Sequence, residues 1–469
     1  MKIASTVRFI CCAAWVATQG TLAAQNHFTD EAEISTFLHD HFGGTNAGMV
    51  IGLLDERGGR ILSAGKLDNQ TSQEVNADTI FEIGSITKTF TALLLLDMVE
   101  RGEMKLDDPV AKYLPSDIKV PAYRDKQITL VNLAAQDSGL PFNAGNLAAG
   151  DWVAAYNAYT ATDLYAFLSC YALTNAPGRK FRYSNVGMSL LGHVIELKAG
   201  TTFESLVVNR ICRPLGMSST FITLAPESKG RLAMGHDEEG RPATYYHLQV
   251  MAGAGALLST ANDLLKYLSA NLGLTPCRLH PLMEAMQAIR HSDSPAEGKT
   301  AMPWFDETAY NPAGSDFLGH AGGTGGCSTF IGFDRLQRRG VVVLSNQRTI
   351  HSSSVGWRIL QCAPLSGLDA ASLQPVREYV AAGFSFDLDK PTGLLRITKV
   401  YPNSPAAAAG LSPGLIIRRI NGVAVAGKSV ADSLELMRGP VGTKERLLLM
   451  TPDGSRTNEV ELSKGKFLF

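Results

Sequence analysis

The pattern that most limits the fold is two β-rich blocks separated by a long helical middle. In the first block, the apolar runs Met49–Leu54 and Gly59–Gly65 flank the turn Asp55–Gly58, which predicts an antiparallel hairpin. The second block holds two further strand-like runs, Thr329–Phe333 and Gly340–Ser345. Strands at both ends of a helical middle predict an α+β fold, in which one mixed sheet has a helical lobe beside it.

Two helices are expected near the first block. Residues 28–42 carry apolar side chains at the spacing of an amphipathic helix, namely Ile34, Phe37, Leu38 and Phe42. A longer helical run extends from Ser85 to about Glu100 and follows the apolar segment Phe81–Gly84. The second helix therefore begins directly after a short strand-like segment.

The N-terminus has the features of a secretory signal. Lys2 and Arg8 supply a positive region, Phe9–Val16 an apolar stretch, and Thr21–Ala24 a run of mostly small residues suited to cleavage. The apolar stretch is shorter than the ~20 residues that span a bilayer. We therefore expect a signal peptide over 1–24, an exported protein in the periplasm or outside the cell, and no integral membrane segment after cleavage. A retained N-terminal anchor is the alternative.

Charge and cysteine content exclude some classes of protein. Lys and Arg (43) nearly balance Asp and Glu (44), giving a formal charge of -1, so nucleic acid is not an expected partner. The five cysteines after the signal are odd in number and irregularly spaced, which fits neither a disulfide scaffold nor a zinc pattern. They are expected to be mostly buried free thiols: Cys170, Cys212, Cys277, Cys327 and Cys362.

A Ser-x-x-Lys pattern lies at the start of the second helix. Ser85 and Lys88 would share one helix face, about one turn apart. The free amides of a helix N-terminus would favour an oxyanion near Ser85. A neighbouring amine can accept the serine proton if burial or positive charge lowers the pKa of that amine. The ordinary alternative is an N-cap serine beside a solvated lysine.

Two further motifs favour the catalytic interpretation. Tyr183 is a candidate proton relay if cations depress the pKa of its phenol, and Asn185 can offer amide hydrogen bonds to a substrate carbonyl and to Lys88. The glycine-rich run His320–Gly326 precedes a predicted strand and would let a substrate backbone approach closely. His320 adds a donor that can be charged near neutral pH.

Together the three motifs resemble the penicillin-recognising serine hydrolases, which include class C β-lactamases, D-alanyl-D-alanine carboxypeptidases and related esterases. The family's Ser-x-x-Lys, Tyr-x-Asn and Lys/His-x-Gly elements match Ser85/Lys88, Tyr183/Asn185 and His320/Gly322. Supporting stretches are Ser138–Pro141, Pro214–Met217 and Ala252–Gly255. The resemblance covers roughly residues 30–350 and implies a β-lactamase/transpeptidase-like fold, with a mixed sheet, flanking helices and a helical lobe.

The resemblance also implies a mechanism. Ser85 would attack a carbonyl to form an acyl-enzyme, with Lys88 and Tyr183 handling the proton, and the backbone amides of Ser85 and Gly323 would form the oxyanion hole. The residues expected to contact substrate are Asn185, His320, Gly322 and Gly323. Members of this family need no metal or cofactor, and the sequence has no His-Glu-x-x-His zinc motif.

The substrate stays open at this level. The third motif is His-Ala-Gly where typical class C β-lactamases have Lys-Thr-Gly, which favours peptidase or esterase chemistry. Loss of the permanent cation weakens recognition of a substrate carboxylate unless His320 is protonated or arginines help. The candidate functions are hydrolysis of D-Ala-D-Ala peptides or β-lactams, esterase or D-amino-acid amidase activity, and a penicillin-binding sensor with little turnover. Cys327, an alternative nucleophile, is expected to be a packed thiol.

A separate C-terminal module is expected. Residues 379–469 resemble a bacterial PDZ domain on the segments Gly383–Phe386, Ile397–Ala406, Ala409–Gly414, Ile417–Gly422 and Arg438–Thr443. The predicted organisation is thus a signal peptide (1–24), a hydrolase domain (28–362), a linker (363–378) and a PDZ domain (379–469).

The PDZ resemblance implies a peptide ligand added to a sheet edge. Its carboxylate would bind at Gly383, Phe384, Ser385 and Phe386, and a helix over Val430–Met437 would form the other wall. The alternatives are a PDZ-centred peptide-binding protein with a degenerate hydrolase, and a PDZ module without a ligand. The apolar tail Lys466–Phe469 suggests that the chain end occupies a PDZ groove, with a closing strand as the alternative.

Overall fold

The structure is a computed structural model that describes most of residues 28–467. The residues left out within this range are 69–71, 149, 289–290, 295–297, 307–314, 367, 369–378, 382–383, 390–391, 401–403, 429–432, 434–435 and 438–442. The predicted signal peptide, most of the predicted linker and Gly383 lie outside the described residues.

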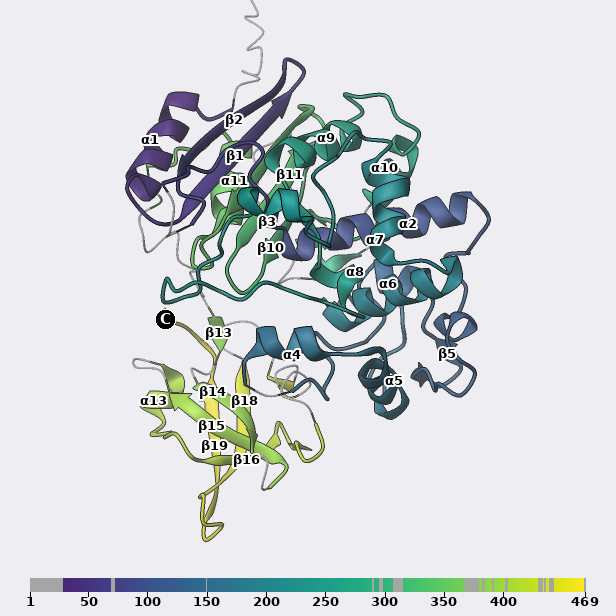
Figure 1. The fold of residues 1–469 in the computed structure, drawn as a ribbon. Coiled ribbons are helices and arrows are strands. Elements are labelled where there is room, and N and C mark those ends of the chain that lie inside the picture. Colours follow the sequence, from purple (N-terminus) through teal and green to yellow (C-terminus); the bar gives the residue numbers. More distant parts are fainter. Residues whose placement is uncertain are drawn as a thin grey trace, which may run out of the picture.

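An eight-stranded sheet forms the centre of the larger unit (Figure 1). Its order is β2 (Gly58–Gly65), β1 (Gly48–Asp55), β12 (Arg339–Ser345), β11 (Ser328–Asp334), β10 (Phe317–Gly323), β9 (Phe305–Asp306), β8 (Gly298–Thr300) and β7 (His291–Ser294). The predicted hairpin and both later strands are confirmed. Every pairing in this sheet is antiparallel, so the prediction of a mixed sheet is wrong in strand direction.

Helices cover both faces of this sheet. Met49, Ile51 and Leu53 of β1 pack with α1 (Glu31–Phe42) and α11 (Ser352–Leu360). Val50 and Leu54 belong to the larger core on the other face, which includes α9 (Ala261–Asn271). This alternation follows from the two-residue period of a strand. α1 buries all four apolar residues of the predicted amphipathic helix.

The helical lobe continues the larger core. It contains α2 (Thr87–Glu100), α3 (Leu130–Ala134), α4 (Trp152–Ala158), α5 (Ala161–Cys170), α6 (Asn185–Ala199), α7 (Phe203–Val207), α8 (Ala252–Gly255) and α10 (His280–Met286). Two small sheets accompany it, β3 (Phe81–Glu82) with β6 (Leu258–Ser259) and β4 (Ala122–Tyr123) with β5 (Lys126–Gln127). α2 is buried along nearly all of its length, which places its first turn in the interior.

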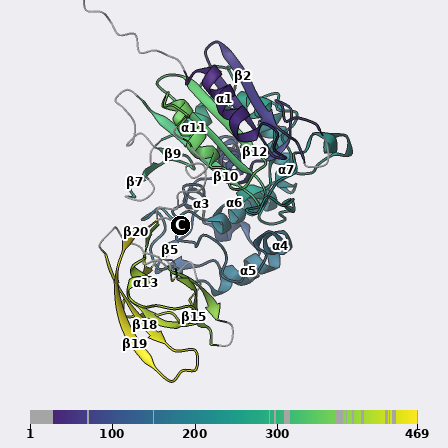
Figure 2. The same cartoon turned by 90° about the vertical axis from the view of Figure 1, so that its left-hand side faces the viewer.

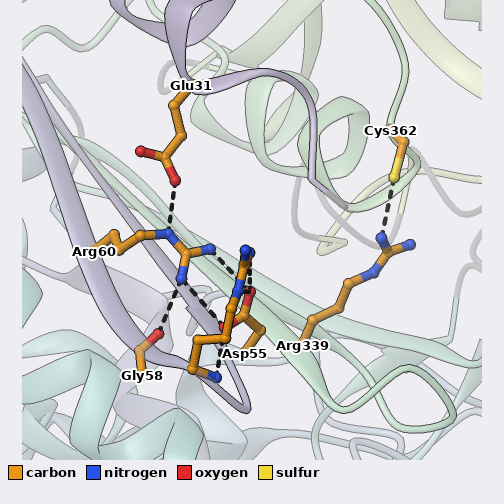
Figure 3. Close-up of polar contacts among 7 residues, drawn as sticks. Glu31, Asp55, Gly58, Arg60, Arg339 and Cys362 are labelled. Carbon is orange, nitrogen blue, oxygen red and sulfur yellow. Dashed lines mark hydrogen bonds and ion pairs between the residues drawn. The ribbon is translucent and has the colours of Figure 1, made fainter. Parts of the chain in front are cut away.

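Arginines tie the first helix to the hairpin (Figure 3). Arg60 donates from Nε to Glu31 of α1 at 2.7 Å and from Nη2 to Asp55 at 2.9 Å. These hydrogen bonds, with those from Arg57, hold the pKa of Asp55 well below its usual value despite partial burial. Nearby, Arg339 of β12 donates to Cys362 Sγ at 3.0 Å, just beyond the end of α11.

The C-terminal strands form a second unit with its own core, apart from the eight-stranded sheet in both views (Figures 1 and 2). The sheet order is β14 (Phe384–Asp389), β15 (Leu394–Val400), β16 (Ile416–Ile420), β18 (Lys444–Met450) and β19 (Thr457–Ser463), with β17 (Val423–Ala424) paired to β16. A short helix, α13 (Pro405–Ala408), follows β15.

A separate two-stranded sheet includes residues near the end of the chain. β20 (Gly465–Phe467) pairs with β13 (Tyr379–Ala381), so that Phe467 lies opposite Tyr379. The pairing of Lys466 and Phe467 agrees with the closing-strand alternative, and occupation of a PDZ groove by the tail stays a prediction. Leu468 and Phe469 lie outside the described residues.

Within the described residues, none of the five cysteines that follow the predicted signal forms a disulfide. The prediction that most are buried is wrong: Cys212 and Cys327 are buried, while Cys170 and Cys362 are exposed. No helix within the described residues has the length and apolar character needed to cross a membrane.

Candidate active site

Ser85 lies in a tight turn, η1 (Gly84–Ile86), immediately before α2. Gly84 has φ 50°, a left-handed conformation that favours glycine. A Cβ on Gly84 would also lie 2.8 Å from both the amide nitrogen and the carbonyl oxygen of Gly323. The absent side chain thus lets the backbone of β10 approach the turn that carries Ser85.

Lys88 is fully buried beside Ser85. Its Nζ donates to Ser85 Oγ at 2.8 Å and to the carbonyl oxygen of Ala254 at 2.6 Å. Burial lowers its pKa well below the ordinary lysine value, and within the described residues no carboxylate forms an ion pair with it. A neutral amine at this distance can accept the serine proton. The alternative of a solvated lysine is therefore wrong.

Tyr183 faces the same pair of residues. Lys88 Nζ lies 4.9 Å from the centroid of its ring, and Tyr183 lines the same pocket as Ser85. Burial raises the pKa of Tyr183, so the expectation that neighbouring cations depress this pKa is wrong. The reason is that the nearest amine is itself desolvated. Tyr183 is therefore a protonated donor, and Lys88 the better proton acceptor.

Local hydrogen bonds place Tyr183 and Asn185 at the start of α6. Ser184 caps the helix by accepting from Gly187 N at 2.9 Å, and its own hydroxyl donates to Pro141 O at 2.6 Å. Gln136 Oε1 accepts from Ser184 N at 2.7 Å. This anchoring fixes the two flanking side chains toward the pocket.

Asn185 belongs to a polar network that the sequence did not reveal. Its Nδ2 donates to Asn143 Oδ1 at 3.2 Å and to the Tyr156 hydroxyl at 3.3 Å, and that hydroxyl donates to Asn143 at 2.5 Å. Its expected hydrogen bond to Lys88 is absent from the described residues. Asn143 lies two residues after the Ser138–Pro141 stretch, and this proximity is the feature of the sequence that could have identified it as a site residue.

His320 is buried and neutral. Its Nδ1 is hydrogen-bonded to Ala321 O at 2.7 Å, while its Nε2 is buried without a partner in the described part of the chain. Desolvation, followed by the neighbouring Lys88, lowers the pKa of His320 to about 3. The expectation of a histidine charged near neutral pH is therefore wrong, and His320 does not replace the lysine of the typical motif as a cation.

Substituting His320 by glutamine should leave the shape of the pH–rate profile between pH 5 and 8 unchanged, because the histidine carries no charge there. Stability should respond instead. The folded pKa of about 3 lies below the ordinary 6.5, so His320 costs stability as pH falls through 6.5, by at most about 1.4 kcal/mol per pH unit. Chemical unfolding should show that His320→Gln loses less unfolding free energy between pH 7 and pH 5 than the wild type does. An altered profile with an equal loss of stability would contradict a neutral histidine.

The two glycines of the third motif have different surroundings. Gly323 lines the pocket, and a Cβ there would meet Arg348 Nη1 at 3.1 Å. Gly322 does not line the pocket, because its Cα faces Ile83 O and Thr329 Oγ1, which an added Cβ would overlap. The prediction that Gly322 contacts substrate therefore finds no support in the geometry.

Arg348 is the cation at this site that sequence reasoning did not name. It is half-buried in the pocket wall, and no carboxylate of the described residues pairs with it. It follows β12 by three residues, and nothing in the surrounding sequence marks it as functional. Its guanidinium is available to bind an anionic group.

The pocket around Ser85 has a volume of about 660 Å³. Aromatic side chains form much of its wall: Phe142, Trp152, Tyr156, Tyr183, Tyr246, Phe305, Phe330 and Trp357. Phe142 and Trp152 remain 48% and 42% exposed at their positions in this wall. Within the described residues no cluster of metal-ligating side chains occurs.

The residues expected to bind a peptide carboxylate begin an edge strand. Phe384, Ser385 and Phe386 lie in β14, the first strand of its sheet, and Phe386 packs in the core of the C-terminal unit. An edge strand presents unpaired backbone groups to which a peptide can add. Gly383 and most of the expected helix over Val430–Met437 lie outside the described residues.

Known proteins resemble both units. A family model described as Beta-lactamase matches residues 38–361, and one described as PDZ domain matches residues 396–449. The D-alanyl-D-alanine-carboxypeptidase/endopeptidase AmpH of Escherichia coli is 31% identical over 234 residues, 50% of this chain and 60% of that protein. The chain thus spans less than two thirds of that relative.

Two further proteins extend the comparison. A beta-lactamase of Escherichia coli is 26% identical over 345 residues, 67% of this chain and 88% of that protein. The crystal structure of a class C beta-lactamase from Rhodobacter sphaeroides matches with a TM-score of 0.58 at 25% identity, covering 69% of this chain and 95% of the other. The eight-stranded sheet and its helices are therefore similar to those of class C beta-lactamases.

Proposed function

This chain belongs to the beta-lactamase family of serine hydrolases and carries a PDZ domain, and on that premise we propose that Ser85 is the nucleophile of an exported acyl-transfer hydrolase. The observation that carries the proposal is the buried amine of Lys88, whose pKa burial lowers, at 2.8 Å from Ser85 Oγ. The proposed substrates are peptide-like amides, including D-Ala-D-Ala peptides, and β-lactams.

In the proposed acylation, Ser85 Oγ attacks the substrate carbonyl carbon while Lys88 Nζ takes the serine proton. The amides of Ser85 and Gly323 stabilise the oxyanion of the tetrahedral intermediate, which typically contributes ~3–4 kcal/mol per donor. The C–N bond then breaks, and the leaving nitrogen receives a proton from Lys88 through the Tyr183 hydroxyl. Water releases the acyl group by the reverse sequence, with the same groups activating it.

Arg348 supports a substrate with a carboxylate. Because His320 is neutral, the guanidinium beside Gly323, which pairs with no carboxylate in the described part of the chain, is a cation that can recognise a terminal carboxylate or the carboxylate of a β-lactam. The relatives named as carboxypeptidase/endopeptidase and beta-lactamase agree with both substrate classes. A second candidate, esterase or D-amino-acid amidase activity on apolar substrates, is favoured by the aromatic wall of the pocket.

The test is the intact mass of the mature protein after exposure to a penicillin and, separately, to a fluorophosphonate. We expect one covalent adduct in each case, with fluoride as the leaving group from the fluorophosphonate, and no adduct in Ser85→Ala. Ser353→Ala is the matched control, since Ser353 also lines the pocket and should not be needed for labelling.

The outcomes separate the candidate functions. A lasting penicillin adduct supports a penicillin-binding peptidase or sensor, and turnover of a D-Ala-D-Ala peptide separates those two. Penicillin consumed without an adduct supports a β-lactamase, and labelling by the fluorophosphonate alone supports the esterase or amidase. No Ser85-dependent reaction with either reagent contradicts the proposal and leaves peptide binding by the PDZ domain as the function.

For the PDZ domain we propose a C-terminal peptide ligand added to the edge of β14. The edge position of β14 supports this proposal. We also propose a signal peptide over 1–24, a linker over 363–378, a PDZ domain over 379–469, and export of the protein to the periplasm or out of the cell.

A further inference from the structure

A buried carboxylate on the segment that carries the nucleophile has no role in the acyl-transfer steps above. Glu82 of β3 precedes Ser85 by three residues and is 4% exposed. Its Oε1 accepts from Tyr246 N at 2.6 Å, and its Oε2 accepts from Thr324 Oγ1 at 2.8 Å. One side chain therefore connects the nucleophile segment to two other segments of the pocket.

Each of these two partners continues into the site. Thr324 follows Gly323 and closes a turn, since Thr324 N donates to Cys327 O at 3.0 Å and Thr324 Oγ1 accepts from Cys327 N at 3.1 Å. Tyr246 lines the pocket directly. A shift of Glu82 would therefore move the strand end that carries the Gly323 amide, together with the Tyr246 wall.

The bonding pattern favours an ionised carboxylate. Tyr246 N can only donate, and Thr324 Oγ1 already accepts from Cys327 N and, at 3.4 Å, from Gly326 N, so its own hydrogen is left for Glu82. Both carboxylate oxygens must accept at once. A protonated carboxyl group offers one good acceptor oxygen and one donor, and therefore satisfies these two partners less well.

We propose that Glu82 is a positioning residue, whose ionised carboxylate fixes the positions of the Gly323 amide and of Tyr246 in the pocket wall relative to Ser85. The inference rests on the proposed function, because it concerns the oxyanion hole of that reaction. It predicts that loss of the charge slows acylation of Ser85 without removing any group that touches the substrate.

The titration of the neighbouring groups named next does not overlap with that of Glu82 in the pH–rate profile. Burial raises the pKa of Tyr245, Tyr246 and Cys327, the titratable neighbours, and all three stay neutral at working pH. The charged group nearest to Gly323 in this wall is Arg348. Desolvation raises the pKa of Glu82 to about 6, so the carboxylate is ionised at pH 7.5 and largely protonated at pH 5.

The experiment measures the second-order rate of Ser85 labelling by a fluorophosphonate in the full chain between pH 5 and 8. The variants are Glu82→Gln, Thr324→Val and the double variant. We expect each single variant to label about 10- to 100-fold more slowly at pH 7.5, the cost of a misplaced catalytic group. The double variant should be no slower than the worse single variant, because both act through one hydrogen bond. Thr324→Ser, which keeps the hydroxyl, should restore the rate.

The pH dependence distinguishes positioning from simple damage to the fold. The wild-type labelling rate should decrease as the pH is lowered below about 6, and the rate of Glu82→Gln should not show this decrease. Stability should move in the opposite direction. Because the folded pKa of about 6 lies above the ordinary 4.5, the folded chain binds this proton more tightly, and Glu82 gains stability as pH falls through 6. The melting temperature of the wild type minus that of Glu82→Gln should therefore rise from pH 7.5 to pH 5.

The two proposals fail in different ways. A wild-type chain that does not label at Ser85 overturns both the proposed function and this inference. A wild-type chain that labels, with Glu82→Gln equally fast and its limb near pH 6 unchanged, overturns the inference alone. Additive losses in the double variant also overturn it, because the two side chains would then act independently.

Discussion

Replacing Lys88 with methionine is expected to slow labelling of Ser85 about 1000-fold while leaving the protein folded. The amine is the proton acceptor 2.8 Å from Ser85 Oγ, and loss of a general base typically costs about 10²- to 10⁴-fold in rate. Methionine has a similar length and fills the same buried space without a charge. Two quantities are measured for each protein: the rate of fluorophosphonate labelling and the midpoint of urea unfolding.

Stability should hardly change because two effects oppose each other. Removing a desolvated amine stabilises the fold, whereas the Ala254 carbonyl that accepts from Nζ loses its donor, at a cost of about 1–3 kcal/mol. The folded pKa of Lys88 lies below its unfolded value of 10.5, so the wild type gains stability as pH rises toward 10.5 and the methionine variant lacks this gain.

The control for this experiment is Lys119→Met, which changes an exposed lysine and should label at the wild-type rate. A Lys88→Met variant that labels within tenfold of the wild type would contradict the assignment of Lys88 as the base. A variant that is unfolded at neutral pH would contradict the view that this lysine is kept for chemistry and not for stability.

Replacing Gly322 with alanine is expected to reduce both stability and labelling rate, by about 2–3 kcal/mol and about 100-fold respectively. The new methyl group would overlap Ile83 O, a backbone atom that cannot move without shifting the nucleophile segment, and Thr329 Oγ1, which donates to that same oxygen. β10 must then move away from the turn that carries Ser85. Urea unfolding and the labelling rate measure the two effects.

The neighbouring glycine supplies a matched control. In Gly323→Ala the methyl group would lie 3.1 Å from the end of the flexible Arg348 side chain, which can rotate away, and the backbone amide is retained. We expect a loss of stability below about 1 kcal/mol for this variant. Equal losses in both variants would show that Gly322 does not set the distance between β10 and the nucleophile turn.

Much of the fold was predictable because its signals are local. The apolar period of α1, the hairpin β1–β2 and the helical run after Ser85 depend on side chains a few positions apart. The direction of the strands was not predictable, because the order β1–β12–β11–β10 pairs segments from opposite ends of the hydrolase domain. The closing strand β20 is a similar case, since its partner β13 lies more than 80 residues earlier.

The candidate site divides in the same way. The spacing of Ser85 and Lys88, and of Tyr183 and Asn185, places each pair on one short element, so the sequence by itself determined which side chains meet and indicated the family, which the comparisons confirm. It did not determine their charge states. Only the tertiary structure decided that the pKa values of Lys88 and His320 are lowered, because desolvation depends on what many distant segments place around a group. The same holds for Arg348 and Glu82: each contributes through partners that are close in space and remote in sequence, and no local pattern records such contacts.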